Sequence, residues 1–270
     1  MAKFTHLHVH SHYSLLDGLA KIDDLVARAK ALGMESLALT DHGTLYGAVE
    51  FFQKAKKAGL KPIIGCEIYL TNNKMAEKRP DDKRFHLTLL VKNKTGYGNL
   101  VQLITKAHLE GFYYKPRVDK DCLKEHAEGL ICLSGCSNAE IPHLIYSNQM
   151  EAAKNAALEY QNIFGKENFY IELQPHLELD RSKKIYPKLL ALAQELEIPT
   201  VATNDAHYLL KEDDDYQDVL LAIGTGNKVS DQNRLTMKGV NLSLRSAEEM
   251  EELFKDLPED DPHLRKPDIT

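Results

Sequence analysis

Long apolar runs and frequent cysteines are both missing from this sequence. None of its apolar segments approaches the roughly 20 residues that a membrane-spanning helix needs. The N-terminal residues lead directly into a strand-like pattern and contain no apolar signal region. The 4 cysteines are better explained as reduced thiols than as a disulfide framework. We therefore expect a cytoplasmic protein with no membrane partner.

An excess of positive charge is also missing. The net charge of −6 gives no electrostatic footprint for strong independent binding to nucleic acid. Internal repeats and low-complexity linkers are absent from the sequence, and 270 residues can bury a sizeable core as one large domain. We expect that domain over residues 1–257. Residues 258–270 are rich in proline and charge, and we expect them to form a flexible tail.

Strand-like and helix-like segments alternate along the chain. Apolar and β-branched runs predict strands at 4–10, 36–40, 62–70, 85–92, 129–134, 169–174 and 199–203. Amphipathic patterns predict helices at 22–32, 46–58, 97–109, 140–146, 150–163, 182–196 and 213–223. Seven strands separated by helices are typical of a parallel α/β architecture.

Potential metal ligands recur where these strands end. His8 and His10 share one face of the first strand because side chains alternate along a strand. Asp205 and His207 repeat the spacing after the last strand. Histidines with carboxylates and a thiol suit a bound divalent metal in a hydrolytic site. The full candidate set is His8, His10, Asp17, His42, Glu67, His86, Cys136, Asp205 and His207.

Most of these candidates belong to the C-terminal ends of their strands, where β/α barrels gather their active sites. His86 is the exception, because we place it at the start of its strand. Either that boundary is wrong or the strand runs in a different direction from the others. If the set were only polar residues satisfied by neighbours, the two paired motifs would have no explanation.

Some assignments have alternatives. Asp17 precedes Gly18, a good turn pair, and Cys136 could be a buried thiol. Asp41 could orient His42 or another ligand, or cap a helix.

Other polar residues are candidates for roles beside the ligands. Lys115 and Arg117 follow aromatic residues and could engage a substrate phosphate, or lie in a solvated loop. Glu172, Gln174 and His176 alternate at the end of the sixth strand, and we place them beside the pocket rather than among its ligands.

Several segments together resemble the PHP (polymerase and histidinol phosphatase) superfamily. They include HLHVHSHYSLLDG (6–18), LTDHGTLYGAVEF (39–51), KPIIGCEIYL (61–70), HLTLLVKNKTGYGNL (86–100), EGFYYKPRVD (110–119), GLICLSGC (129–136) and VATNDAHYL (201–209). The resemblance covers residues 3–257. It is strongest to the N-terminal PHP domain of bacterial DNA polymerase III alpha subunits, through YGAVEF and EGFYYKPR.

The resemblance implies a distorted seven-stranded (β/α)7 barrel with three divalent metal ions at the C-terminal strand ends. Zinc is the expected metal, with manganese, iron and magnesium as alternatives. One ion would be held by His8, His10, Glu67 and Asp205, and Glu67 would bridge to a second that His86 and Cys136 complete. Asp17, His42 and His207 would hold the third. His8, His10, Glu67, Asp205 and His207 would form the catalytic set.

The implied activity is that of a metal-dependent phosphoesterase, in the form of a 3′→5′ exonuclease acting on the 3′ end of single-stranded DNA. The implied partners are the rest of the alpha subunit and the replisome. Polymerisation would reside in a palm domain outside this chain. Two alternatives are a metal-stabilised structural module with little turnover and a small-molecule phosphatase acting on compounds like histidinol phosphate.

Overall fold

A single curled sheet organises the part of the chain that the computed structural model describes, which is residues 4–15, 17–174 and 176–255. Its hydrogen-bonded order is β4-β5-β2-β3-β6-β7-β8, and β1 pairs with β2 outside that path. The strands are β1 (Ser36–Leu39), β2 (Lys61–Thr71), β3 (Arg84–Val91), β4 (Phe112–Tyr113), β5 (Lys115–Val118), β6 (Leu130–Leu133), β7 (Phe169–Leu173) and β8 (Thr200–Ala202).

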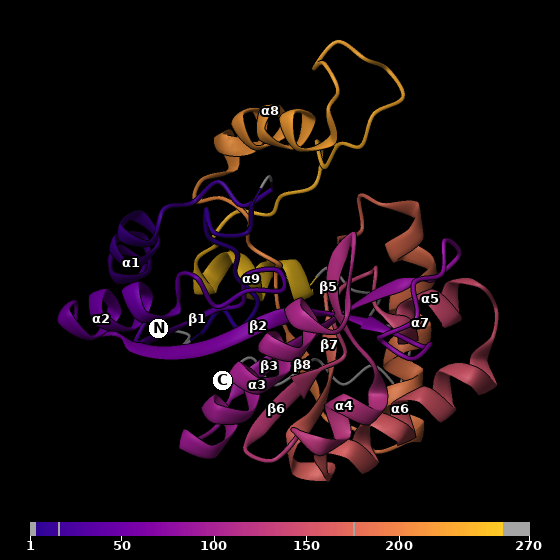
Figure 1. Cartoon of the computed structure of the whole chain (residues 1–270). Helices are drawn as coiled ribbons and strands as arrows, with labels where there is room; N and C mark the ends of the chain where they lie inside the picture. The colour runs from indigo at the N-terminus through magenta and orange to yellow at the C-terminus, as the bar shows by residue number, and fades with distance from the viewer. Residues whose placement is uncertain (1–3, 16, 175, 256–270) are drawn as a thin grey trace.

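Helices cover the outside of this sheet, and α8 stands apart on the side where the strand ends meet (Figure 1). They are α1 (Ile22–Ala31), α2 (Ala48–Lys57), α3 (Lys94–Leu109), α4 (Lys120–Glu125), α5 (Glu140–Tyr146), α6 (Met150–Phe164), α7 (Asp180–Glu195), α8 (Asp214–Thr225) and α9 (Ala247–Lys255). None of the described helices is long and apolar enough to cross a membrane. The expected boundary at residue 257 lies outside the described residues.

The segment 4–10 closes the sheet although it forms no continuous strand. On one side the backbone N–H of Ala38 donates to the carbonyl oxygen of His6 at 2.9 Å. On the other side the N–H of His10 donates to the carbonyl oxygen of Ala206 at 2.8 Å. The segment therefore lies between β1 and the chain that follows β8. The predicted distorted (β/α)7 barrel is confirmed, with the short β4–β5 hairpin as an addition that the sequence analysis missed.

Strand β3 corrects the expectation of a wholly parallel sheet. It pairs antiparallel with both β2 and β6, and His86 lies opposite Tyr69 of β2. Parallel neighbours need a crossover connection, usually a helix. The described connection from β2 to β3 contains no helix, so β3 returns in the opposite direction. Its first residues consequently lie beside the C-terminal ends of its neighbours, which explains the exceptional position of His86.

The main apolar core lies between the sheet and helices α3, α6 and α7. Leu87 of β3, Leu103 of α3, Tyr160 of α6, Phe169 of β7 and Leu190 of α7 are all buried there. A second cluster packs α1 and α2 against β1. Burying apolar area contributes about 25 cal/mol per Å². These two cores pack the helices against the outer face of the sheet. The polar side chains described below lie at the ends of the strands, away from these cores.

Candidate metal centre

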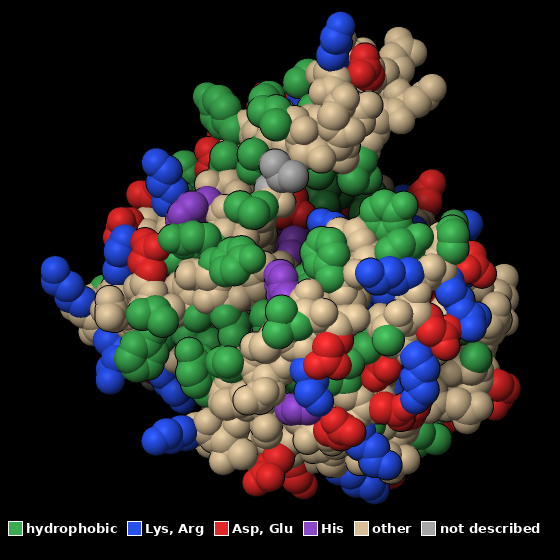
Figure 2. Space-filling model, in the orientation of Figure 1, with side chains coloured by type: hydrophobic (Ala, Val, Ile, Leu, Met, Phe, Trp, Pro, Cys, Tyr) green, Lys and Arg blue, Asp and Glu red, His purple; other side chains and the backbone are tan. Residues whose placement is uncertain are grey.

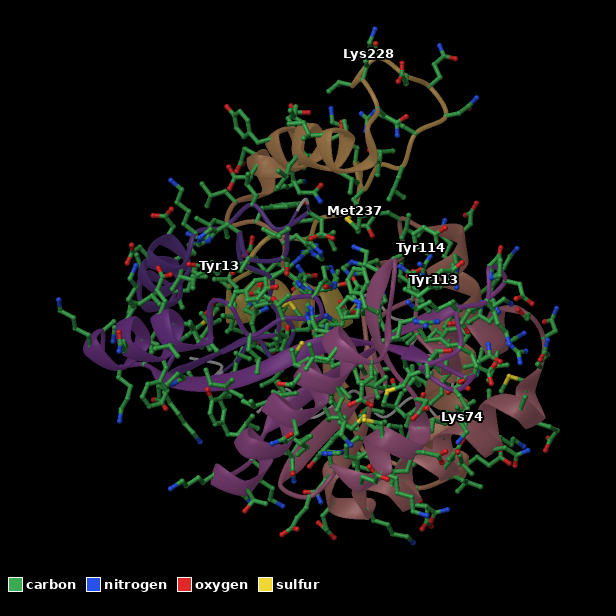
Figure 3. All side chains as sticks on the ribbon, in the orientation of Figure 1. Tyr13, Lys74, Tyr113, Tyr114, Lys228 and Met237 are labelled. Carbon is green, nitrogen blue, oxygen red and sulfur yellow. The ribbon has the colours of Figure 1, made fainter. Side chains whose placement is uncertain are left out.

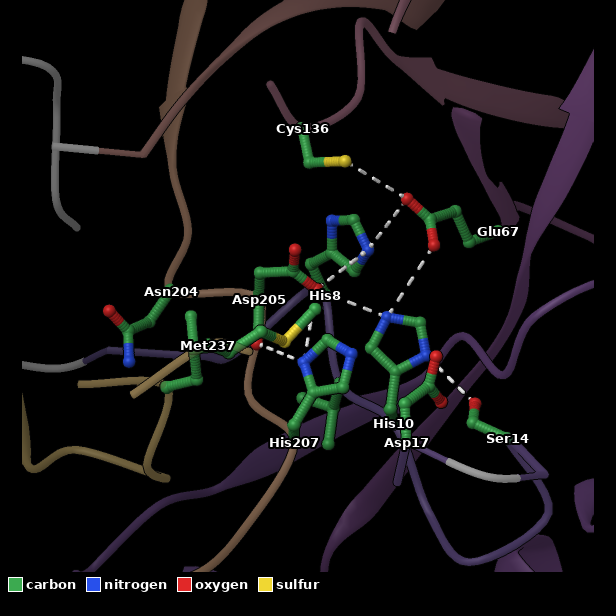
Figure 4. A network of polar contacts seen from close by, with 12 residues as sticks. His8, His10, Ser14, Asp17, Glu67, Cys136, Asn204, Asp205, His207 and Met237 are labelled. Atoms are coloured by element: carbon green, nitrogen blue, oxygen red, sulfur yellow. Dashed lines mark hydrogen bonds and ion pairs between the residues drawn. The ribbon is translucent and has the colours of Figure 1, made fainter. Parts of the chain in front are cut away.

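All nine candidate ligands converge at one end of the curled sheet. Figure 4 labels seven of them, all except His42 and His86. His8 and His10 come from the closing segment, Glu67 from β2 and His86 from the start of β3. The others come from loops: Asp17 before α1, His42 after β1, Cys136 after β6, and Asp205 and His207 after β8. The antiparallel direction of β3 is what brings His86 to the same end.

Glu67 lies at the centre of this cluster with 1% of its surface exposed. Its carboxylate oxygens lie 2.5 Å from His42 Nδ1, 2.9 Å from His86 Nδ1 and 3.4 Å from His8 Nε2. Cys136 Sγ is 3.5 Å from Glu67 Oε1. The Glu67 carboxylate thus has candidate ligand atoms of other residues on both sides. A carboxylate that bridges two metal ions requires such a position.

Asp205 forms the second carboxylate of the cluster. Its Oδ1 atom lies 3.1 Å from His10 Nε2 and 3.3 Å from His8 Nε2. Its φ of 52° falls in the left-handed region, which aspartate and asparagine tolerate better than most residues. Non-glycine residues in that region are concentrated at functional sites because the surrounding structure must enforce the conformation. The turn directs the carboxylate back toward the two histidines.

Asp17 lies in a turn, as its sequence context suggested, and also contacts another candidate ligand. Its carboxylate lies 3.1 Å from His42 Nε2. It also sits in a tight turn, because the N–H of Gly18 donates to the carbonyl oxygen of Ser14 at 2.9 Å. A Cβ atom at position 18 would stand 2.0 Å from the carbonyl oxygen of Ser11, so glycine is required there. The turn holds Asp17 against His42.

Three histidine rings are fixed so that Nε2 faces the cluster. His8 Nδ1 donates to Glu172 at 2.6 Å, and His207 Nδ1 donates to the carbonyl oxygen of Asp205 at 2.7 Å. His10 Nδ1 lies 2.9 Å from Ser14 Oγ, whose hydroxyl hydrogen is directed to a carboxylate. A histidine that binds metal usually donates its other ring N–H in this way. The Nε2 atoms of these three candidate ligands therefore face the interior of the cluster.

Buried polar atoms that make no hydrogen bond of acceptable geometry accumulate in the same place, although some of them, such as His42 Nδ1 and Glu67 Oε2, lie close to one another. Leaving one such atom unsatisfied costs about 1–3 kcal/mol, so seven in one cluster need a compensating ligand. Divalent cations accept this set of nitrogen, oxygen and sulfur donors, and zinc suits it well. The seven atoms within the described residues are His8 Nε2, His10 Nε2, Asp17 Oδ1, His42 Nδ1, Glu67 Oε2, Asp205 Oδ1 and His207 Nε2.

The pKa values of the cluster favour ionised carboxylates at Asp17 and Glu67 and a neutral imidazole at His10. Burial, together with the neighbouring His42 and His207, lowers the pKa of His10 to about 3 although Asp205 acts to raise it. Burial would raise the pKa of Asp17, but His42 lowers it to about 2. Burial likewise opposes the ionisation of Glu67, yet the surrounding histidines hold its pKa well below the usual value.

Two other candidate ligands, His8 and Cys136, would have to lose a proton before they could bind metal. Burial works to lower the pKa of His8, but Asp205, Glu172 and Glu67 outweigh it and raise the pKa well above the usual value. Burial and the nearby carboxylates also raise the pKa of the Cys136 thiol. A bound cation would reverse these shifts, because a coordinating thiol is deprotonated and metal binding releases protons.

Glu172 is the residue whose role sequence analysis missed. We placed it beside the pocket, and it lies buried behind His8, 2.6 Å from Nδ1. Its carboxylate also accepts from Thr203 Oγ1 at 2.6 Å and from Gln174 Nε2 at 2.9 Å. The alternation of Glu172 and Gln174 at a strand end was the available signal.

Asp41 orients a ligand, as one of its two interpretations proposed, but that ligand is His10. Its carboxylate accepts from Ser14 Oγ at 2.9 Å, and Ser14 contacts His10. It also accepts from the N–H of Ser11 at 2.6 Å. Helix α2 begins only at Ala48, so Asp41 does not cap it. The two serines carried no recognisable signal in the sequence.

The prediction that Arg117 engages a substrate phosphate is wrong. Its side chain is completely buried and its guanidinium pairs with Asp82. Further N–H groups donate to the carbonyl oxygens of Met75, Glu77 and Gly111 at 2.9–3.0 Å. The guanidinium holds the β2–β3 loop against the β4–β5 hairpin and has no donor to offer a substrate. Lys115 differs, because it is exposed and lines the cavity described next.

A cavity of about 610 Å³ opens above the cluster. Asp17, His42, His86, Asp205 and His207 line its base. Figure 2 shows histidine, acidic and basic side chains meeting in a hollow beneath the α8 lobe. His8 and His10 are completely buried beneath that surface. The cavity therefore gives access to the cluster at its more exposed members, which are Asp17, His86 and Asp205.

Comparisons with known proteins show which family the chain resembles. The family model described as the PHP domain matches residues 6–176. The DNA polymerase III subunit alpha of Borreliella burgdorferi is 49% identical over 261 residues, which are 96% of this chain and 23% of the relative. The corresponding subunit of Thermus aquaticus is 46% identical over 258 residues, 92% of this chain and 21% of the relative. The chain thus spans about a quarter of the length of these relatives.

A solved structure has the same fold. The crystal structure of a protein from Bifidobacterium adolescentis, described as a metal-dependent phosphoesterase, superposes with a TM-score of 0.50. The match covers 94% of this chain and 97% of that protein, at 12% sequence identity. At that identity the likeness is evidence for the fold alone.

Proposed function

Because the chain belongs to the PHP domain family, we propose that it is a metal-dependent phosphoesterase that acts as a 3′→5′ exonuclease on single-stranded DNA. The observation that carries this proposal is the group of seven buried, unpartnered ligand atoms beneath an open cavity. Bound divalent cations would supply hydroxide at neutral pH and stabilise charge on the phosphate oxygens.

The residues divide into a buried base and an exposed edge. His8, His10 and Glu67 are buried and would hold the ions in place. Asp17 and Asp205 are the more exposed carboxylates and face the cavity, so they border the phosphate position. We propose three ions, with zinc first and manganese, iron or magnesium as alternatives. Glu67 would bridge two of them, because its carboxylate lies between His8 of one proposed ligand set and His86 of the next.

The relatives indicate the setting of this activity. The matched relatives are DNA polymerase III alpha subunits in which this region is about a quarter of the length. We propose that the rest of such a subunit and the replisome are partners, in the cytoplasm, and that the 3′ end of a DNA strand is the substrate. Removal of a terminal nucleotide there would serve proofreading.

One observation favours a second candidate function, a structural module with little turnover. The ligands join the closing segment, β2, β3 and the loops after β1, β6 and β8. An ion bound there would stabilise the barrel even without catalysis, since metal binding contributes folding free energy.

The deciding experiment follows oligonucleotides labelled at the 3′ or the 5′ end, with manganese, zinc or chelator. The proposal expects metal-dependent, stepwise shortening from the 3′ end that is lost in Asp205→Asn. Asparagine tolerates the left-handed conformation, so this variant changes charge without disturbing the turn. Asp23→Asn, an exposed aspartate paired with Lys54, is the control and should remain active.

Each other outcome identifies an alternative. Folded, metal-loaded protein with no activity would favour the structural module. Turnover of small phosphomonoesters in preference to DNA would favour the small-molecule phosphatase.

A further inference from the structure

Four cations surround the mouth of the cavity, and we propose that they bind the phosphates of a DNA strand next to the phosphate at the metal centre. This phosphate rim consists of Lys83, Arg84, Lys115 and Arg181. Tyr114 beside it would stack on a base. The inference rests on the proposed nuclease function and names how the strand is held.

The rim cations are distinguished by having no acidic partner. Within the described residues, none of the four lies within 4.0 Å of a carboxylate oxygen. Elsewhere such partners are common: Lys54 pairs with Asp23 at 2.7 Å, and Lys120 pairs with Glu159 at 2.7 Å. The cavity is also lined by three aspartates, of which Asp82 pairs with Arg117 and the other two, Asp17 and Asp205, belong to the candidate metal centre. The four rim cations are thus left without a carboxylate partner of their own among the described residues, in a chain of net charge −6.

The structure holds these cations without using up their donors. Lys115 lies over the ring of Tyr69 at 5.5 Å, and Arg84 lies over the ring of Tyr114 at 5.8 Å. Contact with a ring face positions a cation and leaves its N–H groups available. Lys83 Nζ lies 3.0 Å from His143 Nε2, a neutral neighbour that would not satisfy a full charge.

Arg181 adds a partly satisfied guanidinium from the start of α7. Its Nη2 donates to the carbonyl oxygen of Ser137 at 2.8 Å, and its plane lies over Tyr146 at 5.0 Å. Its Nε is buried without a hydrogen-bond partner among the described residues. The rim therefore draws on β3, β5 and α7, so that the cavity mouth receives positive charge from more than one side.

The aromatic residue of the proposed site is Tyr114. It occupies the turn between β4 and β5 with φ of 59° and has 73% of its surface exposed. The ring of Tyr113 packs against it at 4.5 Å and Arg84 contacts it, so the turn is supported. Figure 3 labels both tyrosines on the side that faces α8 and Met237. An exposed, supported ring is what a nucleobase needs for stacking.

The wall opposite the rim is apolar. Leu221 of α8, together with Leu235 and Met237 after it, lines the cavity on that side. One cationic wall and one apolar wall in about 610 Å³ correspond to the two parts of a nucleotide, phosphate and base. A small phosphomonoester would use the metal centre and leave this wider arrangement without a role.

Salt dependence of binding gives a direct test. For single strands, log K falls with log salt by about 0.7 for each phosphate neutralised. Binding of a fluorescent single-stranded oligonucleotide is measured by anisotropy over a salt series. The double variant Lys83→Ala/Arg84→Ala should reduce the slope by about 1.4 and weaken binding at low salt. An unchanged slope, or wild-type protein that binds no oligonucleotide at low salt, overturns the proposal.

The matched control removes two exposed cations away from the cavity. Lys56 and Lys57 are the last residues of α2. They lie in the chain just before Lys61, where β2 begins, and the cavity lies near the other end of that strand. Lys56→Ala/Lys57→Ala makes the same change in net charge and should leave the slope as in the wild type. An equal loss in this control would show that the effect is one of total charge and would contradict a localised rim.

Two further measurements separate the parts of the proposal. Tyr114→Ala should lower affinity on the order of tenfold while leaving the salt slope unchanged, because stacking releases no counterions. Metal-dependent turnover of bis(p-nitrophenyl) phosphate by the wild type and by the control Lys56→Ala/Lys57→Ala reports on the metal centre separately, because that substrate has one phosphate and none that could reach the rim. Absence of turnover in the metal-loaded wild type would refute the proposed nuclease activity. The slopes of log K against log salt test the phosphate rim independently of that activity.

Discussion

Glu172 provides the sharpest prediction about the metal centre. Its Oε1 atom accepts from His8 Nδ1, Thr203 Oγ1 and Gln174 Nε2 at 2.6–2.9 Å. Its Oε2 accepts from the N–H of Gly135 at 3.1 Å. In Glu172→Gln an NH₂ group replaces one oxygen, and either orientation directs a donor at existing donors. The NH₂ group then faces either His8 Nδ1 or the N–H of Gly135, so the carboxylate that fixes the His8 ring is lost or displaced.

The expected loss of metal affinity follows from this geometry. Removing the partner of a metal-binding histidine typically weakens binding by about 10–100-fold. That range corresponds to about 1.4–2.8 kcal/mol. We expect the upper part of it, because the charge of Glu172 is lost together with the hydrogen bond to His8. Zinc affinity is measured by competition with a chromophoric chelator, at a pH where wild-type protein is fully loaded.

Glu140 supplies the matched control for this experiment. It is also buried, and it accepts from Tyr160 at 2.6 Å and from Asn72 at 2.9 Å, but it contacts no candidate ligand. Glu140→Gln should lower the free energy of unfolding without changing zinc affinity. Wild-type affinity in Glu172→Gln, or an equal loss in both variants, would refute the reasoning.

Three further predictions concern the same region. Cys136→Ala should lower the metal content measured by elemental analysis, whereas Cys132→Ala, a buried thiol outside the cluster, should not; equal metal content in both would contradict ligation by Cys136. Chelation should lower the melting temperature by about 5–10 °C in thermal scanning, since an ion at 100 times its Kd contributes about 2.7 kcal/mol, and restored metal should reverse the change. Burial lowers the pKa of His6 to about 4, below its ordinary value of about 6.5, so the folded state binds fewer protons than the unfolded chain. Stability of the chelated protein should therefore fall by roughly 3 kcal/mol as the pH drops from about 6.5 to about 4, and His6→Gln should remove that part of the slope in urea titrations.

Local sequence patterns determine the faces on which side chains lie and the positions of the covering helices. The spacing of His8 and His10 places both rings on one face wherever the segment lies, because alternation is a property of extended backbone. Apolar periodicity likewise marked the helices that cover the sheet, since an amphipathic helix must bury its apolar side. The nine candidate ligands that the structure brings together can all be recognised in the sequence from their side-chain chemistry and their positions at strand ends.

Other features depended on which segments become neighbours. The direction of β3 follows from a connection without a helix, and it alone carries His86 to the cluster. Arg117 resembled a surface cation in the sequence, yet the fold surrounds its guanidinium with Asp82 and backbone carbonyls. Burial and pairing of this kind are properties of the packed chain and leave no trace in residue spacing.

The support of the metal centre was likewise decided by tertiary structure. Glu172 stands 164 positions from His8 in the sequence, and Asp41 reaches His10 only through Ser14. The sequence by itself determined which side chains could bind metal, because ligand chemistry belongs to the residue. Only the closed barrel decided which ring nitrogens face the centre, because that depends on hydrogen-bond partners supplied by distant strands and loops.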